Sequence, residues 1–177
     1  MPAIKVHDKL FDIYLSEETI QQRIKELGAA INKDYAGKRP LFIAILNGSF
    51  MFASDLFKHL TIEAELCFIK LASYKGLKSS GKVITTIGLE EDIFDKEIII
   101  VEDIVDTGKT MNRFLPRLLH QHPKSLKIIT LLHKKEATEY PLTLDYIGFE
   151  IPNKFVVGYG LDYDGLGRNL KEIYQLL

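Results

Sequence analysis

Two short runs of the chain contain only apolar residues, and they constrain the fold more than any other feature. Residues 41–46 are Leu-Phe-Ile-Ala-Ile-Leu, and residues 98–101 are Ile-Ile-Ile-Val. A strand that is apolar on both sides of its pleat is typical of a parallel sheet covered by helices on both faces. The two runs therefore predict an α/β protein with a mostly parallel central sheet flanked by helices.

Helical and strand patterns alternate along the rest of the chain. Helices are predicted at 16–31, with Ser16 as the N-cap, at 50–60, and at about 107–121, where Pro116 kinks or restarts the helix. Further strands are predicted at residues 65–72, 83–87, 126–132, 146–150 and 155–159. No repeat and no long linker divides the chain, so a single domain over residues 1–177 is expected.

Charge and cysteine content exclude several classes of protein. The chain has 23 Lys and Arg against 24 Asp and Glu, which gives no sign of a general nucleic-acid or membrane-binding surface. Its one cysteine, Cys67, excludes an intramolecular disulfide and a cysteine-based zinc finger, and we expect an ordinary buried thiol. No signal-peptide pattern and no apolar stretch of membrane-spanning length are present, so a cytoplasmic location is expected.

The segment that follows the second apolar run carries the chemistry. Glu102 and Asp103 come directly after it, then Asp106, and Thr-Gly-Lys-Thr opens a predicted helix. Ligands of open α/β sheets bind beyond the carboxyl ends of the strands. A glycine there lets backbone N–H groups approach a phosphate, and a helix N-terminus favours an anion. The pattern predicts a phosphate-binding loop made of Asp106, Thr107, Gly108, Lys109 and Thr110.

Two better-known nucleotide loops do not fit this segment. A Walker A loop requires glycine at position 103, which is Asp, and no Gly-x-Gly-x-x-Gly follows a predicted strand. Phosphate alone does not favour three neighbouring carboxylates. They are explained if they bind sugar hydroxyls and a hard cation such as Mg²⁺ that also contacts the substrate. The expected ligand is a phosphorylated sugar with free hydroxyl groups.

Residues 101–110, Val-Glu-Asp-Ile-Val-Asp-Thr-Gly-Lys-Thr, resemble the phosphoribosyl-pyrophosphate signature of type I phosphoribosyltransferases in their hypoxanthine-guanine form. The similarity extends over roughly residues 10–170. Leu46-Asn47-Gly48-Ser49 resembles the family's pyrophosphate loop, which often has a cis peptide, and Ser73-Tyr74 resembles the dipeptide on its catalytic flap. Lys134 matches the lysine that reads the purine, and residues 148–163 resemble the purine-binding tail. Arg168 falls where the family places an arginine near the pyrophosphate. The resemblance implies the type I fold, with a small hood of short strands from the N-terminal residues and about 134–177.

The resemblance also implies an activity and a set of roles. The reaction is Mg²⁺-dependent transfer of phosphoribosyl from phosphoribosyl-pyrophosphate to N9 of hypoxanthine, and of guanine, which gives IMP or GMP in purine salvage. The implied catalytic residues are Asp106 as general base, Tyr74 and Lys134. The implied binding residues are Glu102, Asp103, Asp106, Thr107, Gly108, Lys109 and Thr110 for phosphoribosyl-pyrophosphate, Asn47, Gly48, Ser73 and Arg168 for pyrophosphate, Lys134, Phe155, Val156 and Asp162 for the purine, and Glu102, Asp103 and Asp162 for metal.

Several positions leave a structural alternative open. Asp106 is also a plausible helix N-cap, Phe155 a plausible core residue, and the flap from 73 to 82 a plain lysine-rich loop. Lys135 follows Lys134 directly, so the purine reader could shift by one position. Asn47 stands where many relatives carry lysine, which leaves one cation fewer for the leaving group.

Other functions remain as alternatives. One is a preference for xanthine, or for guanine above hypoxanthine. Another is a regulator that senses phosphoribosyl-pyrophosphate and binds nucleic acid, which needs a basic face that the charge balance does not favour. The third is an interaction protein with a dead site, which the intact acids and Lys134 argue against. The resemblance implies a homodimer or homotetramer, with a candidate seam at Phe50, Met51 and Phe52.

Overall fold

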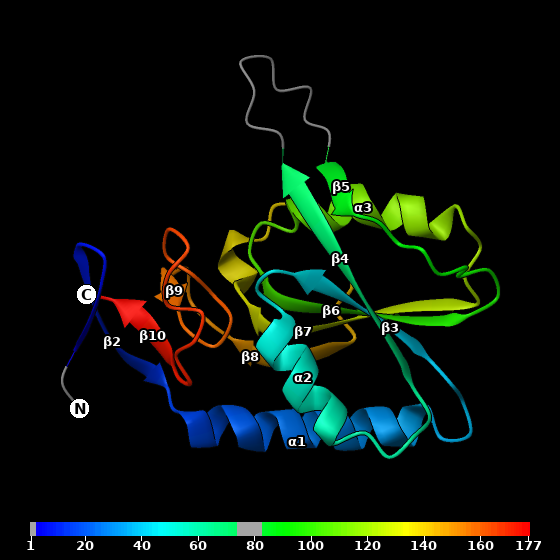
Figure 1. Ribbon diagram of the computed structural model, residues 1–177, viewed down its shortest axis with the longest axis horizontal. Helices are drawn as coiled ribbons and strands as arrows, with labels where there is room; N and C mark the ends of the chain where they lie inside the picture. Colours follow the sequence, from blue (N-terminus) through cyan, green and yellow to red (C-terminus); the bar gives the residue numbers. More distant parts are fainter. Residues whose placement is uncertain (1–2, 74–82) are drawn as a thin grey trace.

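The computed structural model describes residues 3–73 and 83–177, and its centre is a six-stranded sheet (Figure 1). The order across this sheet is β5-β4-β3-β6-β7-β8. Neighbouring strands are parallel from β4 to β8, and β5 joins the edge antiparallel to β4. The strand bounds are β3 Leu41–Leu46, β4 Glu65–Ser73, β5 Val83–Ile87, β6 Glu97–Val105, β7 Ser125–His133 and β8 Tyr146–Glu150. The predicted mostly parallel sheet is confirmed.

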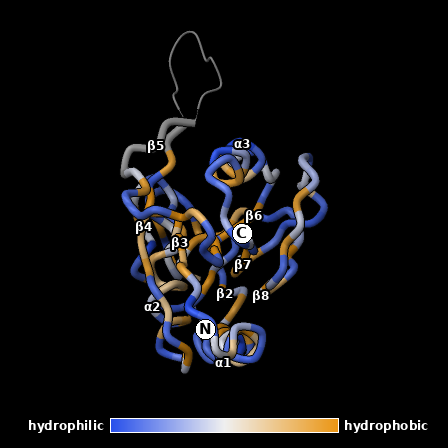
Figure 2. Tube along the Cα trace, turned by 90° about the vertical axis from the view of Figure 1, so that its right-hand side faces the viewer, coloured by the Kyte–Doolittle hydropathy of each residue, from blue (hydrophilic) through white to orange (hydrophobic). Residues whose placement is uncertain are grey.

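Helices cover both faces of the sheet. The helices are α1 Glu17–Asp34, α2 Phe50–Lys58 and α3 Lys109–Leu119. Phe42 and Ala44 of β3 belong to the cluster that contains α1 and α2, whereas Ile43 and Ile45 belong to the cluster that contains α3. Figure 2 shows the apolar strands lying between α1 and α3, whose outer sides are hydrophilic. The apolar run is thus buried on both faces, as its sequence predicts.

The starts of two helices differ in how well the sequence predicts them. Ser16 is the N-cap of α1, and its hydroxyl accepts a hydrogen bond from the Thr19 amide at 3.2 Å. Helix α3 begins at Lys109 rather than Thr107, because Gly108 is its N-cap and adopts a left-handed conformation with φ of 79°. The interpretation of Asp106 as the helix N-cap is therefore wrong. Pro116 lies inside α3, so the helix does not restart there.

Strand β6 is longer than the apolar run that predicted it. It continues through Glu102 and Asp103 because its backbone stays paired with β7 as far as the Val105–His133 pair. The two acids therefore alternate across the pleat of a strand, and Asp106 is the first residue beyond it.

The two ends of the described chain form a second, smaller antiparallel sheet. Its order is β1-β2-β10-β9, and its strands are β1 Ile4–Val6, β2 Lys9–Leu15, β9 Val156–Val157 and β10 Ile173–Leu176. It has a small core of its own made of Val6, Phe11, Val157 and Tyr174. In Figure 1 this sheet lies beside the carboxyl ends of the large sheet's strands, in the place expected for a hood. We refer to the small sheet and the segment 158–172 as the hood.

Three smaller expectations are resolved by burial. Cys67 is a free, buried thiol, and burial raises its pKa to about 12. Phe52 is fully buried in the core, so the predicted seam cannot include it, whereas Phe50 is exposed at the surface. Among residues 3–73 and 83–177, no helix is long and apolar enough to cross a membrane.

Candidate active site

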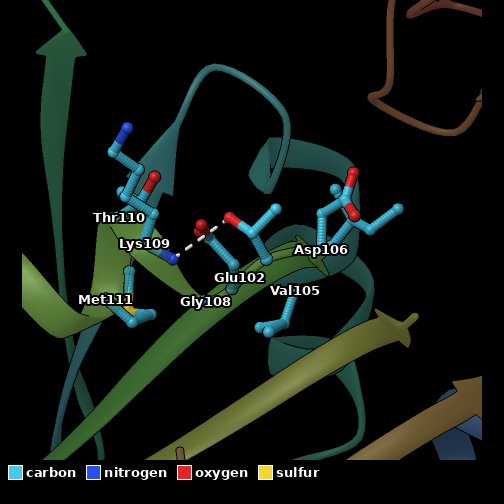
Figure 3. A pocket seen from close by; sticks show the side chains of 9 residues that line it. Glu102, Val105, Asp106, Gly108, Lys109, Thr110 and Met111 are labelled. Atoms are coloured by element: carbon cyan, nitrogen blue, oxygen red, sulfur yellow. Dashed lines mark hydrogen bonds between the residues drawn. The ribbon is translucent and has the colours of Figure 1, made fainter. Parts of the chain in front are cut away.

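A phosphate-sized pocket lies at the carboxyl end of β6 (Figure 3). It has a volume of about 90 Å³ and is lined by Glu102 and by residues 104–111. The Thr107 carbonyl accepts hydrogen bonds from the amides of Glu139 and Tyr140 at 3.0 and 3.1 Å, which fixes the loop from outside. A Cβ atom on Gly108 would lie 2.9 Å from the Tyr140 carbonyl oxygen, and φ is already positive. Only glycine fits this position, as the predicted phosphate loop requires.

A lysine and a carboxylate form an ion pair beside this pocket. Lys134 Nζ lies 3.2 Å from Asp106 Oδ2, and the amide of Lys134 donates to the Val105 carbonyl at 2.9 Å. The side chain of Lys134 is buried, and that of Asp106 is half exposed. Lys135 points away, with its side chain 73% exposed and its ammonium near Glu150. The geometry therefore selects Lys134, and not Lys135, as the lysine that faces the site.

Two acids with unusual surroundings precede Asp106. Glu102 is 8% exposed, and its Oε2 has no hydrogen-bond partner. Burial, and the nearby charge of Asp103, hold the pKa of Glu102 well above its usual range. Burial also raises the pKa of Asp103 to about 6, although backbone hydrogen bonds and the Arg168 charge lower it in part. A buried carboxylate oxygen without a hydrogen-bond partner, next to a second acid whose pKa is raised, is typical of ligand-binding sites.

The raised pKa of Asp103 has a consequence for stability. A carboxyl whose pKa is higher in the folded than in the unfolded state stabilises the fold below its unfolded pKa of about 4, and that stabilisation is lost as the pH rises through 6. We therefore expect Asp103→Asn to raise the melting temperature of the ligand-free protein at pH 8, with a gain that shrinks below pH 6 and vanishes near pH 4. Thermal melts across this range measure it. Asp95→Asn, at an exposed acid, is the control and should give no such trend; equal gains at pH 4 and pH 8 would contradict the assignment.

The predicted pyrophosphate loop packs tightly against Asp103. The Leu46–Asn47 peptide bond is cis, and Asn47 is exposed whereas Gly48 is buried. A Cβ atom on Gly48 would overlap the Asp103 carboxylate, so the carboxylate rests on the glycine Cα. A Cβ atom on Gly160 would likewise overlap the Gly48 carbonyl oxygen. The loop is thus held between β6 on one side and the hood on the other.

The hood brings the remaining predicted residues to the same edge. Asp162 Oδ1 lies 2.6 Å from Nη2 of Arg168. The other terminal nitrogen of Arg168, Nη1, donates to the Gly160 carbonyl at 2.6 Å. Phe155 is 44% exposed, so it is not the core residue that its strand position allowed, and its ring lies 5.7 Å from that of Tyr163. Its neighbour Val156 is buried. An exposed aromatic ring suits a planar ligand, and the Asp162–Arg168 pair on the same hood offers polar groups.

Not every predicted residue can be placed, and some residues of interest were not predicted. Tyr74 and the side chain of Ser73 lie outside the part of the chain that the structure describes. Sequence reasoning missed Asp55 and Tyr159, which form a hydrogen bond between α2 and the hood. The two are 104 positions apart in the chain, so only the unusual Gly-Tyr-Gly at 158–160 was available as a signal.

The donors at this edge fit a hard divalent cation that is shared with a substrate. Glu102 offers a buried oxygen without a partner, and Asp103 a second carboxylate. Within the described residues, no group of three or more His, Cys, Asp or Glu side chains could hold a metal by itself. Mg²⁺ commonly binds through one or two carboxylates and completes its shell with water and substrate phosphates. The residues therefore suit Mg²⁺ carried with a phosphate ligand better than a closed protein cage.

Comparisons with known proteins agree on one group. A family model described as "Phosphoribosyl transferase domain" matches residues 11–164. A hypoxanthine phosphoribosyltransferase of Buchnera aphidicola is 44% identical over 85% of this chain and 87% of its own, and a hypoxanthine-guanine phosphoribosyltransferase of Aquifex aeolicus is 40% identical over 97% and 98%. A solved hypoxanthine phosphoribosyltransferase from Staphylococcus aureus superposes with a TM-score of 0.90 at 41% identity, over 97% of this chain and 94% of that one.

Proposed function

Since the chain belongs to the phosphoribosyl transferase family, and within it to the hypoxanthine-guanine phosphoribosyltransferases, we propose how its residues carry out that family's reaction. The protein is a purine salvage transferase. It transfers 5-phosphoribosyl from phosphoribosyl-pyrophosphate to N9 of hypoxanthine or guanine, and the products are IMP or GMP and pyrophosphate. The roles of single residues, the metal, the oligomer and the cellular location are proposals.

The observation that carries the proposal is the 3.2 Å pair of Lys134 and Asp106 beside the phosphate pocket. A 6-oxopurine presents its O6 and N7 atoms side by side on one edge, whereas adenine replaces O6 by an amino donor. Lys134 donates to O6, and Asp106 accepts the proton that N7 loses as N9 attacks the anomeric carbon. A 6-oxopurine thus replaces the Lys134–Asp106 ion pair by one contact from Lys134 to O6 and one from Asp106 to N7. Adenine instead places its amino group, a donor, against the Lys134 ammonium.

The hood supplies the other side of the purine site. Phe155 stacks on the purine face, since its ring is exposed and lies against the rings of Phe11 and Tyr163. Val156 offers backbone groups to the purine edge. Asp162, held by Arg168, contributes to the purine side and to a second metal position.

The sheet side binds the phosphoribosyl group. Backbone N–H groups and hydroxyls of the 106–110 loop bind the 5′-phosphate, and Glu102 and Asp103 bind the ribose hydroxyls. The leaving pyrophosphate is bound by Asn47, Gly48, Ser73 and Arg168, with Tyr74 on a flap that excludes water from an oxocarbenium-like transition state. Glu102, Asp103 and Asp162 would hold Mg²⁺, which would supply positive charge for the departing pyrophosphate.

The function is tested by a competition assay. The purified protein is incubated with phosphoribosyl-pyrophosphate, Mg²⁺ and equal amounts of hypoxanthine, guanine, xanthine and adenine, and the nucleotides are separated by chromatography. We expect IMP and GMP as the main products and no AMP. The relative amounts rank the bases, and dominance of XMP would favour the xanthine alternative. Formation of no nucleotide, with phosphoribosyl-pyrophosphate still bound, would contradict the catalytic role and favour a sensor.

Removal of the metal tests the proposed cation site. We expect chelation by EDTA to abolish nucleotide formation and added Mg²⁺ to restore it. Because residues 3–73 and 83–177 contain no group of three or more side chains that could hold a metal, calorimetry should detect little Mg²⁺ binding to the protein alone and strong binding when phosphoribosyl-pyrophosphate is present. Full activity in EDTA, or tight Mg²⁺ binding without the substrate, would contradict this arrangement.

The remaining assignments concern the whole protein. We propose a single domain over residues 1–177 whose hood completes the site, a homodimer or homotetramer, and a cytoplasmic location. The exposed Phe50 beside the pyrophosphate loop supports a subunit contact near the site. Light scattering should give twice or four times the chain mass of 20.2 kDa, and a monomer at assay concentrations would contradict the assembly.

A further inference from the structure

The hood segment between β9 and β10 is organised around a single buried tyrosine. The Tyr159 amide donates to the Leu170 carbonyl at 2.9 Å, and the Gly160 amide donates to the Arg168 carbonyl at 3.0 Å. The backbone is left-handed at three successive residues, with φ of 104° at Gly158, 49° at Tyr159 and 96° at Gly160. This turn directs the side chain of Tyr159 away from the hood, and only 1% of the residue remains exposed.

The hydroxyl of Tyr159 contacts the carboxylate of Asp55 on α2, a helix that packs on the large sheet. This hydroxyl donates to Asp55 Oδ2 at 2.5 Å, and Gln21 of α1 donates to the same oxygen at 2.6 Å. Lys58 occupies the other oxygen of Asp55 at 2.7 Å. Burial alone would raise the pKa of Asp55, but these hydrogen bonds outweigh it and lower the pKa. One ionised carboxylate thus joins α1, α2 and the hood.

The residue next to Tyr159 packs the hood directly against the pyrophosphate loop. Gly160 follows directly, and its Cα rests on the Gly48 carbonyl oxygen so closely that no Cβ fits. Gly48 rests in the same way on the Asp103 carboxylate. The hood thus rests on the pyrophosphate loop at Gly160, and that loop rests on Asp103 of β6, which the large sheet holds in place. On its other side, Tyr159 lies three residues after Val156 and four after Phe155.

We propose that Asp55 and Tyr159 are positioning residues, whose hydrogen bond fixes the hood against the pyrophosphate loop and so sets the width of the purine site. The inference rests on the proposed function, in which Lys134 and Asp106 bind the purine from the sheet and Phe155 and Val156 bind it from the hood. Neither Asp55 nor Tyr159 touches substrate. Without the hydrogen bond the two halves of the purine site are no longer held at one separation. The 5′-phosphate loop and the two ribose-binding acids stay in place on the sheet, and Arg168 is still held by Asp162 and by the Gly160 carbonyl.

The test is Tyr159→Phe, which removes one hydroxyl and leaves Asp55 bound to Gln21 and Lys58. We expect KM for hypoxanthine to rise about tenfold, while the calorimetric Kd for phosphoribosyl-pyrophosphate with Mg²⁺ stays within about twofold. Asp55→Ala should act like Tyr159→Phe. Asp55→Asn, whose amide oxygen still accepts from the tyrosine, should keep KM within about threefold of the unchanged protein.

The chain offers a matched control at the other end of α1. Tyr146 of β8 donates to Asp34 Oδ2 at 2.6 Å, which is the same chemistry in a partly buried setting on the large sheet and not on the hood. Tyr146→Phe should lower the melting temperature about as much as Tyr159→Phe does, since each loses one hydrogen bond to a carboxylate, and it should leave KM for hypoxanthine unchanged. If Tyr159→Phe and Tyr146→Phe affect KM equally, the positioning role is wrong and the bond is only structural.

A second measurement does not depend on activity. Amide hydrogen exchange should become faster across residues 158–170 in Tyr159→Phe and remain unchanged there in Tyr146→Phe. Unchanged exchange in both variants would overturn the inference even if the enzyme is fully active. An unmodified protein without transferase activity would overturn the proposed function instead, and the exchange result would still decide whether the hydrogen bond holds the hood. Should Tyr159→Phe fail to fold, the comparison of Asp55→Ala with Asp55→Asn gives the same decision.

Discussion

Replacement of Asp106 by Asn should lower kcat for IMP formation by about 10²–10⁴-fold, the range in which a positioned general base contributes. Asparagine has nearly the same shape, so it keeps the loop closed, but it cannot accept the N7 proton. Binding of phosphoribosyl-pyrophosphate should change little, because the 5′-phosphate pocket is built from backbone N–H groups around Gly108. Steady-state kinetics with each substrate varied in turn, together with calorimetry, separate the two effects.

The same experiment distinguishes a base from a purely electrostatic residue. Asp95→Asn, at an exposed acid before the amino end of β6, is the matched control and should leave kcat unchanged. If Asp106→Asn keeps kcat within about fivefold while KM for the purine rises, Asp106 acts only by holding Lys134 at 3.2 Å. The N7 proton would then leave through water, and the assignment of the general base would be withdrawn.

Replacement of Gly48 by Ala should lower kcat/KM by about 10²-fold or more. The added methyl group overlaps the Asp103 carboxylate, and the Gly48 carbonyl is already in contact with Gly160. The methyl group can be accommodated only if the ribose-binding acid or the pyrophosphate loop moves, and a misplacement of about 1 Å near reacting groups costs about 10²-fold in rate. We expect KM for phosphoribosyl-pyrophosphate to rise and kcat to fall, since Gly48 belongs to the proposed pyrophosphate loop and contacts Asp103, the proposed ribose-binding acid.

Gly88→Ala is the control for this substitution. Gly88 is exposed and its φ is not in the left-handed region. Among the described residues other than its two chain neighbours, no atom lies within 4 Å of the position that a Cβ would take. That variant should retain full activity and stability. A Gly48→Ala protein with unchanged kcat/KM would show that Asp103 can move aside at no cost, and would contradict the view that the ribose and pyrophosphate sites are rigidly joined.

The parts of this fold that the sequence predicts are those with a local cause. The alternating burial of Phe42 and Ile43 follows from an apolar run, and the start of α1 follows from the N-cap chemistry of Ser16. Helix α3 starts two residues later than predicted, because Gly108 is its left-handed N-cap, at a place where a Cβ atom would meet the Tyr140 carbonyl. The segment after β7 supplies that carbonyl, and no window around residue 108 contains it.

The site shows the same division. The phosphate loop is contiguous, so its residues were predicted together and lie together in the pocket. The choice between Lys134 and Lys135 was open in the sequence, because it depends on which of two adjacent side chains turns toward Asp106. The Asp55–Tyr159 hydrogen bond was beyond reach, because it joins residues whose separation is meaningful only after the large sheet and the hood have formed.

The strand order of the hood bears on when the protein becomes an enzyme during its synthesis. Strand β10 is an inner strand, paired with β2 on one side and β9 on the other, and it is made of residues 173–176. A ribosome that has released residues up to about 150 has already produced every strand of the large sheet, including the phosphate loop. The hood side of the proposed purine site is complete only when residues 173–176 have been made and inserted between β2 and β9. The strand that closes the hood is therefore made after every strand of the large sheet and after the whole phosphate loop.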